Sequence, residues 1–135
     1  MVNNKVKKWI LKAMENYKTI QHEFTFPEKE IITSTVCFHS QQFVEKVLKA
    51  YLTYKKVDFK KIHNIDLLLK FCIEKYNEFK ELYVGDLTTY AVEFRYPDEF
   101  YIPSLKEAKQ CFNIVDKVKD FVFKKLKINE NNYVK

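Results

Sequence analysis

Glycine is nearly absent from this chain of 135 residues: Gly85 is the only one, and there are 3 prolines. A β-sheet fold needs many tight turns, and turns need glycine, proline, asparagine or aspartate at defined positions. Aromatic residues, in contrast, make up 16% of the chain and can fill a core. A chain of this length forms one domain around one core. The composition therefore argues against an all-β architecture and favours a few long helices.

Long apolar runs are also missing. No stretch approaches the roughly 18 apolar residues of a membrane-spanning helix. The N-terminal residues lack the uninterrupted apolar region and cleavage site of a signal peptide. Cys37, Cys72 and Cys111 are odd in number and far apart, so we expect buried thiols in a reducing compartment rather than disulfides. The sequence thus predicts a cytoplasmic protein with no membrane partner.

Histidine is sparse as well. The three histidines are scattered, and neither an HxxxH nor a CxxC spacing occurs. A metal site needs several such ligands close together, so we expect no metal and no cofactor. His63 precedes a predicted helix start, where we interpret it as a hydrogen-bonded corner, with a ligand contact as the alternative.

Arginine is almost replaced by lysine: of the 24 basic residues, only Arg95 is an arginine. The net charge of +6 would assist binding to phosphates, although lysines on solvated helix faces explain it equally well. A single arginine suggests that a planar, bidentate side chain is needed at one place. Codon bias explains the same pattern, so charge alone leaves the class of partner open.

Apolar residues recur at helical spacing in five segments. We expect helices from Asn3 to Ile20, from Pro27 to Tyr54, from Ile65 to Tyr76, from Asp86 to Phe94 and from Leu105 to Leu126. Asn3 or Asn4, Asn64 and the Ser104–Glu107 capping box provide start signals. The sequence thus predicts an all-α, antiparallel up-and-down bundle of four long helices plus one shorter helix. This single domain covers residues 1–128, and a frayed tail covers 129–135.

The stretch from Cys37 to Tyr51 organises the rest of the chain, because its apolar residues fall into one wide arc of a helix. Ser40 and Gln41 point into that arc. A buried polar group without a partner costs about 1–3 kcal/mol, so we expect partners for both on a neighbouring helix. A polar stripe lies at the side of the arc, and it is either a solvated flank or a binding surface. The stripe consists of His39, Gln42, Lys46 and Lys49.

An aromatic and charged loop, from Arg95 to Pro103, follows the fourth predicted helix. Loops carry function more often than core helices do. Arg95 can hold a phosphate through two parallel hydrogen bonds, and Tyr96 can stack on a base. The alternative is that Arg95 and Asp98 pair with each other or with Glu45, which would fix the loop to the bundle.

Four short pieces, in order and at the right separations, resemble the HEPN domain. The similarity is to its stand-alone prokaryotic branch and covers nearly the whole chain. It implies an all-α bundle that forms homodimers and acts on nucleotides or RNA, beside a minimal nucleotidyltransferase in a toxin–antitoxin-like pair. The matching pieces are Phe38–Gln42, Glu45–Lys46, Leu48–Ala50 and Arg95–Asp98. The candidate ligand-binding residues are His39, Gln42, Lys46, Lys49, Arg95, Tyr96 and Asp98.

Many HEPN proteins are metal-independent ribonucleases that depend on an arginine followed a few residues later by a histidine. Here the chain after Arg95 reads YPDEFYIP, and no histidine follows His63. Since the motif is absent, the resemblance implies no catalytic residues. Three interpretations remain: a nucleotide- or RNA-binding protein, a ribonuclease with an altered site at His39 and Arg95, and a purely structural dimerisation module. The proposed pocket requires His39 and Arg95 to meet across neighbouring helices.

Overall fold

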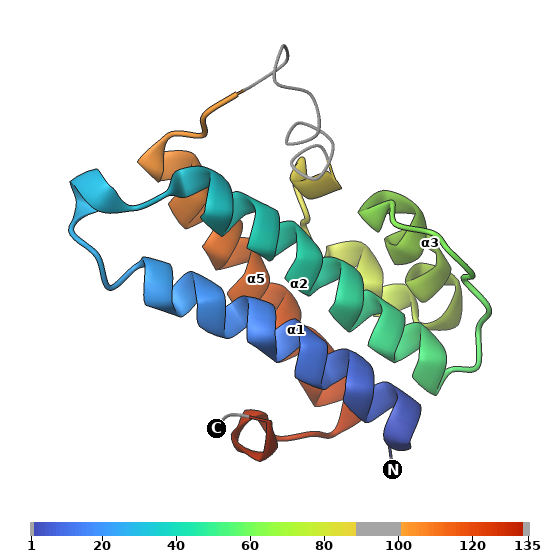
Figure 1. Ribbon diagram of the computed structural model, residues 1–135. Coiled ribbons are helices and arrows are strands. Elements are labelled where there is room, and N and C mark those ends of the chain that lie inside the picture. The colour runs from blue at the N-terminus through green and yellow to red at the C-terminus, as the bar shows by residue number, and fades with distance from the viewer. Residues whose placement is uncertain (1, 89–100, 134–135) are drawn as a thin grey trace.

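The structure is a computed structural model that describes residues 2–88 and 101–133. These residues form α-helices and short 3-10 helices and contain no strand, which confirms the all-helical prediction. The α-helices are α1 (Asn4–Glu23), α2 (Thr33–Tyr54), α3 (Ile65–Lys75) and α5 (Leu105–Leu126) (Figure 1). The 3-10 helices are η1 (Glu28–Glu30), η2 (Asn77–Glu81) and η4 (Glu130–Asn132).

α1, α3 and α5 start at the predicted caps. The side chains of Asn3 and Asn64 each accept a hydrogen bond of 3.0 Å from a backbone amide in the first turn of α1 and α3. At the start of α5, Ser104 Oγ accepts from the Glu107 amide and Glu107 Oε1 accepts from the Ser104 amide, both at 3.0 Å. This reciprocal pair is a capping box, as the sequence predicted.

α2 begins later than predicted. The residues after Pro27 form η1, and the chain is extended at Ile31 and Ile32 before α2 starts. Two β-branched residues in succession favour an extended backbone, and Glu23 Oε2 accepts the Ile32 amide at 2.8 Å. The helix therefore has 22 residues and is about 33 Å long.

Two helices end on a lysine where glycine is usual. Lys56 follows α2 and Lys127 follows α5, with φ values of 60° and 58°. In both cases the next amide bonds back to the last turn of the helix, as in a Schellman motif. This left-handed conformation is strained for every residue with a Cβ. The only glycine, Gly85, has a φ of 54° in the turn just before the helix expected from Asp86 to Phe94.

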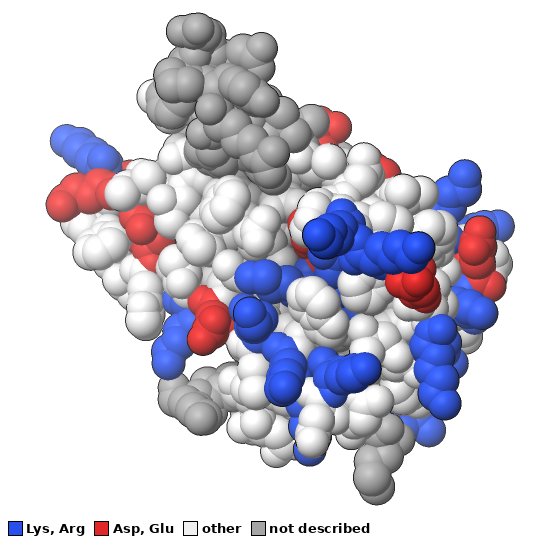
Figure 2. All heavy atoms as spheres, turned by 45° about the vertical axis from the view of Figure 1, so that its right-hand side comes forward, with Lys and Arg blue, Asp and Glu red and all other residues white. Residues whose placement is uncertain are grey.

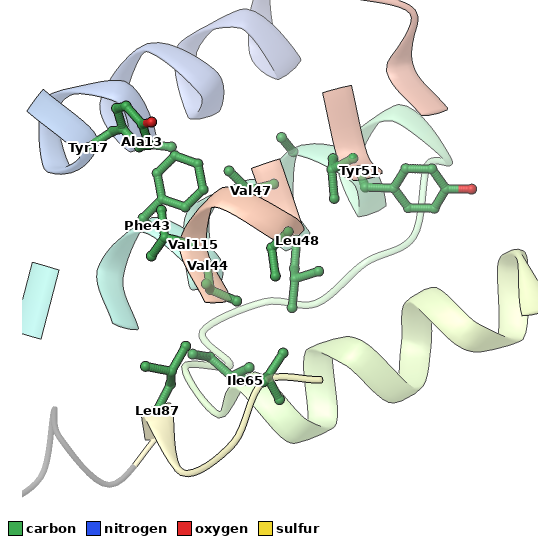
Figure 3. Close-up of a cluster of buried hydrophobic side chains, with 14 of the residues drawn as sticks. Ala13, Tyr17, Phe43, Val44, Val47, Leu48, Tyr51, Ile65, Leu87 and Val115 are labelled. Carbon is green, nitrogen blue, oxygen red and sulfur yellow. The ribbon is translucent and has the colours of Figure 1, made fainter. Parts of the chain in front are cut away.

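α2 is the central helix of the bundle. It lies beside α1, which runs in the opposite direction, and against α5, which runs in the same direction as α2 (Figure 1). α3 packs against α2 at its side. Figure 3 shows the buried side chains where these helices meet, and it labels Ala13, Tyr17, Phe43, Val44, Val47, Leu48, Tyr51, Ile65, Leu87 and Val115.

The polar residues inside the arc of α2 find partners within their own helix. Ser40 Oγ donates to the carbonyl of Val36 at 2.7 Å, and Gln41 Nε2 donates to Glu45 Oε1 at 2.9 Å. The prediction of partners on a neighbouring helix is therefore wrong. Residues four positions apart face each other on a helix, so α2 satisfies these groups without help from another element.

All three cysteines are buried, as predicted. Cys37 Sγ of α2 lies 3.3 Å from Cys111 Sγ of α5. Burial raises the pKa of the Cys72 thiol to about 12, so this thiol stays protonated and unreactive at neutral pH.

The fourth predicted helix lies mostly on residues 89–100, outside the described residues, although Leu87 at its start is buried. The residues after α5, where we expect a frayed tail, include η4. Glu130 of η4 pairs with Lys119, and the Tyr133 ring lies 6.4 Å from the Phe123 ring.

None of the helices in the described part of the chain is long and apolar enough to cross a membrane.

Candidate functional site

The polar stripe of α2 divides between two hydrogen-bond networks. His39 and Lys46 face α1, where both contact Asn16. Gln42 and Lys49 belong to a second network that extends towards the segment before α3. The stripe is therefore neither a simple solvated flank nor one continuous set of ligand donors.

Asn16 of α1 links His39 to Lys46. Lys46 Nζ lies 2.8 Å from Asn16 Oδ1, and Asn16 Nδ2 lies 2.7 Å from His39 Nδ1. An ammonium group can only donate, so it takes the amide oxygen and leaves the amide nitrogen to donate to the histidine. His39 Nδ1 must then be unprotonated, and the hydrogen of the neutral ring lies on Nε2. His39 is thus a hydrogen-bond donor through Nε2.

Both positive and negative side chains act on this network. Burial lowers the pKa of His39, and the charge of Lys46 lowers it further. Burial also lowers the pKa of Lys46, with the charge of Lys12 on α1 as the next cause, while the carboxylates of Glu45 and Glu15 act in the opposite direction. Two ammonium groups therefore lie close enough to repel each other beside a neutral histidine.

The second network is centred on the Glu45 carboxylate. Lys49 Nζ and His63 Nδ1 lie 2.9 Å and 2.8 Å from Glu45 Oε2, while Gln41 donates to Oε1. Burial alone would raise the pKa of Glu45, but the hydrogen bonds from His63, Lys49 and Gln41 outweigh it and lower the pKa. Glu45 is therefore ionised at neutral pH.

Lys49 is buried, because only 5% of its side chain is exposed. Its ammonium lies 5.4 Å from the centre of the Trp9 ring and 5.6 Å from that of Phe59, which adds cation–π attraction to the pair with Glu45. Of the two interpretations of the stripe, the solvated flank is therefore wrong for Lys49. With its charge paired, Lys49 contributes to packing between α1, α2 and the segment before α3.

His63 and Gln42 complete the second network. His63 is 69% exposed but hydrogen-bonded to Glu45 through Nδ1, which confirms the predicted hydrogen-bonded corner. Because Nδ1 donates to the carboxylate, the 3.3 Å approach of Lys49 Nζ to the same atom is not a hydrogen bond. Gln42 Nε2 donates to Gln41 Oε1 at 2.7 Å.

Three of the predicted site residues, Arg95, Tyr96 and Asp98, lie outside the described residues. The meeting of His39 with Arg95 therefore stays a prediction. Within the described ranges, no group of three or more histidine, cysteine, aspartate or glutamate side chains is arranged to hold a metal ion.

Sequence reasoning missed the contribution of α1. Lys12 and Asn16 lie four residues apart on α1. Asn16 is hydrogen-bonded to Lys46 of the stripe, and the charge of Lys12 lowers the pKa of Lys46. Lys12 also borders a hollow of about 360 Å³. The hollow is lined by Lys5, Lys8, Trp9, Lys12 and Thr53.

Figure 2 turns the side with α3 forward and shows lysines gathered on it, with fewer Asp and Glu side chains among them. The signal was present in the sequence as lysines on one side of an amphipathic helix.

The comparison with protein families gives one clear result. A sequence model described as the HEPN domain matches residues 6–127, which is most of the chain. No curated protein and no solved structure matches. The matched range includes all of α2, α3 and α5 and most of α1. The chain therefore belongs to the HEPN domain family, and this membership supports a nucleotide- or RNA-related function at the level of the family.

Proposed function

We propose that this protein is a nucleotide- or RNA-binding HEPN protein that takes phosphate on the face shared by α1 and α2. We further propose that it acts with a minimal nucleotidyltransferase in a toxin–antitoxin-like pair. The observation that carries the binding role is the network in which Asn16 links Lys46 to the neutral His39, beside the hollow on α1 that Lys12 helps to line. Family membership and the net charge of +6 support it.

A phosphate group matches the chemistry of this face. The anion would offset the repulsion between the Lys12 and Lys46 ammonium groups. Lys46 uses one of its three N–H donors on Asn16 and keeps others for a ligand. His39 Nε2–H supplies a neutral donor from the same helix. Arg95 is proposed as a further, bidentate phosphate ligand.

Binding fits the site better than cleavage. A general base must accept a proton through a free lone pair within hydrogen-bond reach of the substrate. The lone pair of His39 on Nδ1 is already used by Asn16. The sequence also lacks a histidine after Arg95. We therefore favour a binding protein over a ribonuclease with an altered site.

The nucleotidyltransferase partner and the homodimer rest on the family alone. Light scattering tests the dimer, which would have about twice the chain mass of 16.4 kDa. Copurification with a co-expressed minimal nucleotidyltransferase tests the heterologous pair. Failure to copurify would remove the partner without affecting the proposed phosphate site.

Calorimetric titration tests the binding role. ATP, GTP and a short single-stranded RNA are titrated into the protein at low and moderate salt. Variants Lys12→Ala and Lys46→Ala are compared with Lys106→Ala, which removes an exposed lysine of α5 away from this face. If RNA binds, removing one lysine that neutralises a phosphate should reduce the slope of log affinity against log salt by roughly 0.7 for a single strand.

We expect Lys12→Ala and Lys46→Ala to weaken binding and reduce its salt dependence, and Lys106→Ala to behave like the wild type. No binding of any of the three ligands would contradict a direct ligand role. Equal weakening by all three substitutions would show diffuse attraction to a basic protein, without a site between α1 and α2.

A further inference from the structure

We propose that Trp9 and the lysines around it form a groove for single-stranded nucleic acid, with a base stacked on the indole ring and phosphates on the lysines. This inference rests on the proposed nucleic-acid function and deepens it. It extends the site from Lys12 along the first half of α1 and predicts an extended strand as ligand rather than a mononucleotide.

The groove begins with a single face of α1. Lys5, Lys8, Trp9 and Lys12 occur at i, i+3, i+4 and i+7, so their side chains follow one another along the helix. From Lys5 to Lys12 the helix rises about 10 Å. This length allows an extended strand to place more than one phosphate along the same face.

Two neighbouring hollows share part of their walls. The hollow of about 360 Å³ beside Trp9 and a second hollow of about 460 Å³ share Lys5 and Thr53 in their walls. The second hollow continues past the end of α2, where Lys56 adds a further positive charge and Asp58 marks an acidic border. The lining therefore combines an aromatic ring, lysine stems and ammonium groups along its length.

Two neighbouring side chains contact the Trp9 ring. The Phe59 ring packs edge-on against it, with the centroids 6.0 Å apart, and the buried Lys49 ammonium lies 5.4 Å from its centre. Trp9 is only partly buried and lines the first hollow. An aromatic side chain that is already ordered loses little conformational freedom when a base stacks on it. Stacking on aromatic side chains is how many proteins bind single strands without reading their sequence.

The lysines of the groove differ from some of the lysines on α5. Lys109 and Lys125 pair with Glu28 and Glu78. Among the described residues, by contrast, no carboxylate forms an ion pair with a groove lysine. The groove lysines are Lys5, Lys8, Lys12 and Lys56. Their charges are thus available to phosphates without the cost of breaking an internal pair.

A single strand fits this groove better than a membrane surface or an acidic peptide. Trp9 lies in the wall of a hollow and is partly buried, whereas a membrane-anchoring tryptophan must protrude to reach the lipid interface. An acidic peptide would use the lysines but would leave the ring without a flat partner. A nucleic-acid strand provides both bases and phosphates at a regular spacing.

Tryptophan fluorescence tests the groove directly, because Trp9 is the only tryptophan in the chain. Short oligoadenylates of RNA and of DNA are titrated into the wild-type protein, with AMP, ATP and phosphatidylserine vesicles as further arms. We expect saturable quenching of Trp9 by both oligonucleotides, weaker at higher salt, and little change with AMP, ATP or vesicles.

Variants are measured by the anisotropy of a labelled oligonucleotide. Trp9→Leu should weaken binding about ten-fold or more, in keeping with the loss of one stacked base. The matched control is Tyr83→Leu, which removes an aromatic side chain that is 76% exposed elsewhere. Thermal melting shows whether Trp9→Leu folds, and the wild-type fluorescence gives an answer even if it does not.

The outcomes separate the groove from the proposed function. Oligonucleotide binding without a change in Trp9 fluorescence would overturn the groove and leave the proposed function standing, as would unchanged affinity in folded Trp9→Leu. A Trp9 response to vesicles alone or to mononucleotides alone would also overturn the groove. Absence of all binding to nucleotides and oligonucleotides would overturn both proposals.

Discussion

At the scale of single residues, the hydrogen bonds between α1 and the polar stripe of α2 depend on which side-chain atoms can donate and which can accept. Asn16 has one acceptor facing Lys46 and one donor facing His39, and this arrangement fixes His39 as neutral. Protonation of His39 would set two donors against each other and add a positive charge beside Lys46. The folded protein therefore resists protonation of this ring.

The resistance of the folded protein to protonation of His39 should be visible in the pH dependence of its free energy of unfolding. Burial and Lys46 hold the pKa of His39 in the folded protein below its ordinary value of 6.5. Between the two pKa values, the unfolded chain binds a proton that the folded protein does not, so the free energy of unfolding falls as the pH falls below about 6.5. Glu45, whose folded pKa is also lowered, has its effect only below its ordinary value of 4.5. The effect of His39 therefore begins at a higher pH than that of Glu45.

Urea unfolding of His39→Gln should therefore lose part of the decrease in stability between about pH 7 and pH 5. A glutamine at this position can still accept a hydrogen bond from Asn16. His22→Gln, which changes an exposed histidine in the last turn of α1, is the control and should retain the wild-type profile. Identical profiles for the wild type and His39→Gln would contradict the assignment of a neutral, half-buried His39.

The roles of individual lysines could not be predicted from the sequence. Helical spacing places Lys46 and Lys49 on the same stripe, yet Lys46 bonds to an amide on α1 and Lys49 pairs with the buried Glu45. Periodicity gives the direction of a side chain relative to its own helix. It does not say which carboxylate or amide a neighbouring element brings to that side.

At the scale of elements, the sequence predicted best what depends on local chemistry. The capping box of Ser104 and Glu107 is formed as predicted, because its donors and acceptors lie within one turn. The start of α2 was predicted too early, because Pro27 and Glu28 are also compatible with the short helix η1. Local signals do not decide whether a first turn continues into a longer helix.

The left-handed lysines after α2 and α5 give a prediction at this scale. Replacing either Lys56 or Lys127 by glycine should remove the strain of the Cβ and stabilise the protein by about 0.5–1 kcal/mol, after allowance for the flexibility of glycine in the unfolded chain. Only Lys56 lines the proposed groove. Lys56→Gly should therefore weaken oligonucleotide binding, whereas Lys127→Gly should not.

Chemical denaturation and oligonucleotide anisotropy on the same two variants check this prediction. Lys127→Gly is a matched control, since both positions follow a helix and have almost the same φ. Equal affinity of the two variants would show that Lys56 takes no part in binding. A loss of stability in both would contradict the view that their backbones are strained.

At the scale of the whole molecule, the fold brings charges together that are far apart in the sequence. The lysines of α1, Lys46 of α2 and Lys56 after α2 lie around one face because α1 and α2 are antiparallel neighbours. The all-helical architecture followed from the scarcity of glycine and the apolar periodicity, and the structure confirms it. The pairing of α1 with α2 across this face is a tertiary contact that periodicity alone does not specify.

The most direct measurement of the central claim is a map of where nucleic acid contacts the protein. A short photoreactive RNA is crosslinked to the wild-type chain, and the crosslinked peptides are identified by mass spectrometry. The claim that phosphate binds between α1 and α2 predicts crosslinks in the segment from Lys5 to Lys12 and around Lys46, suppressed by Lys12→Ala. Crosslinks concentrated on α5, unchanged by Lys12→Ala, would contradict it.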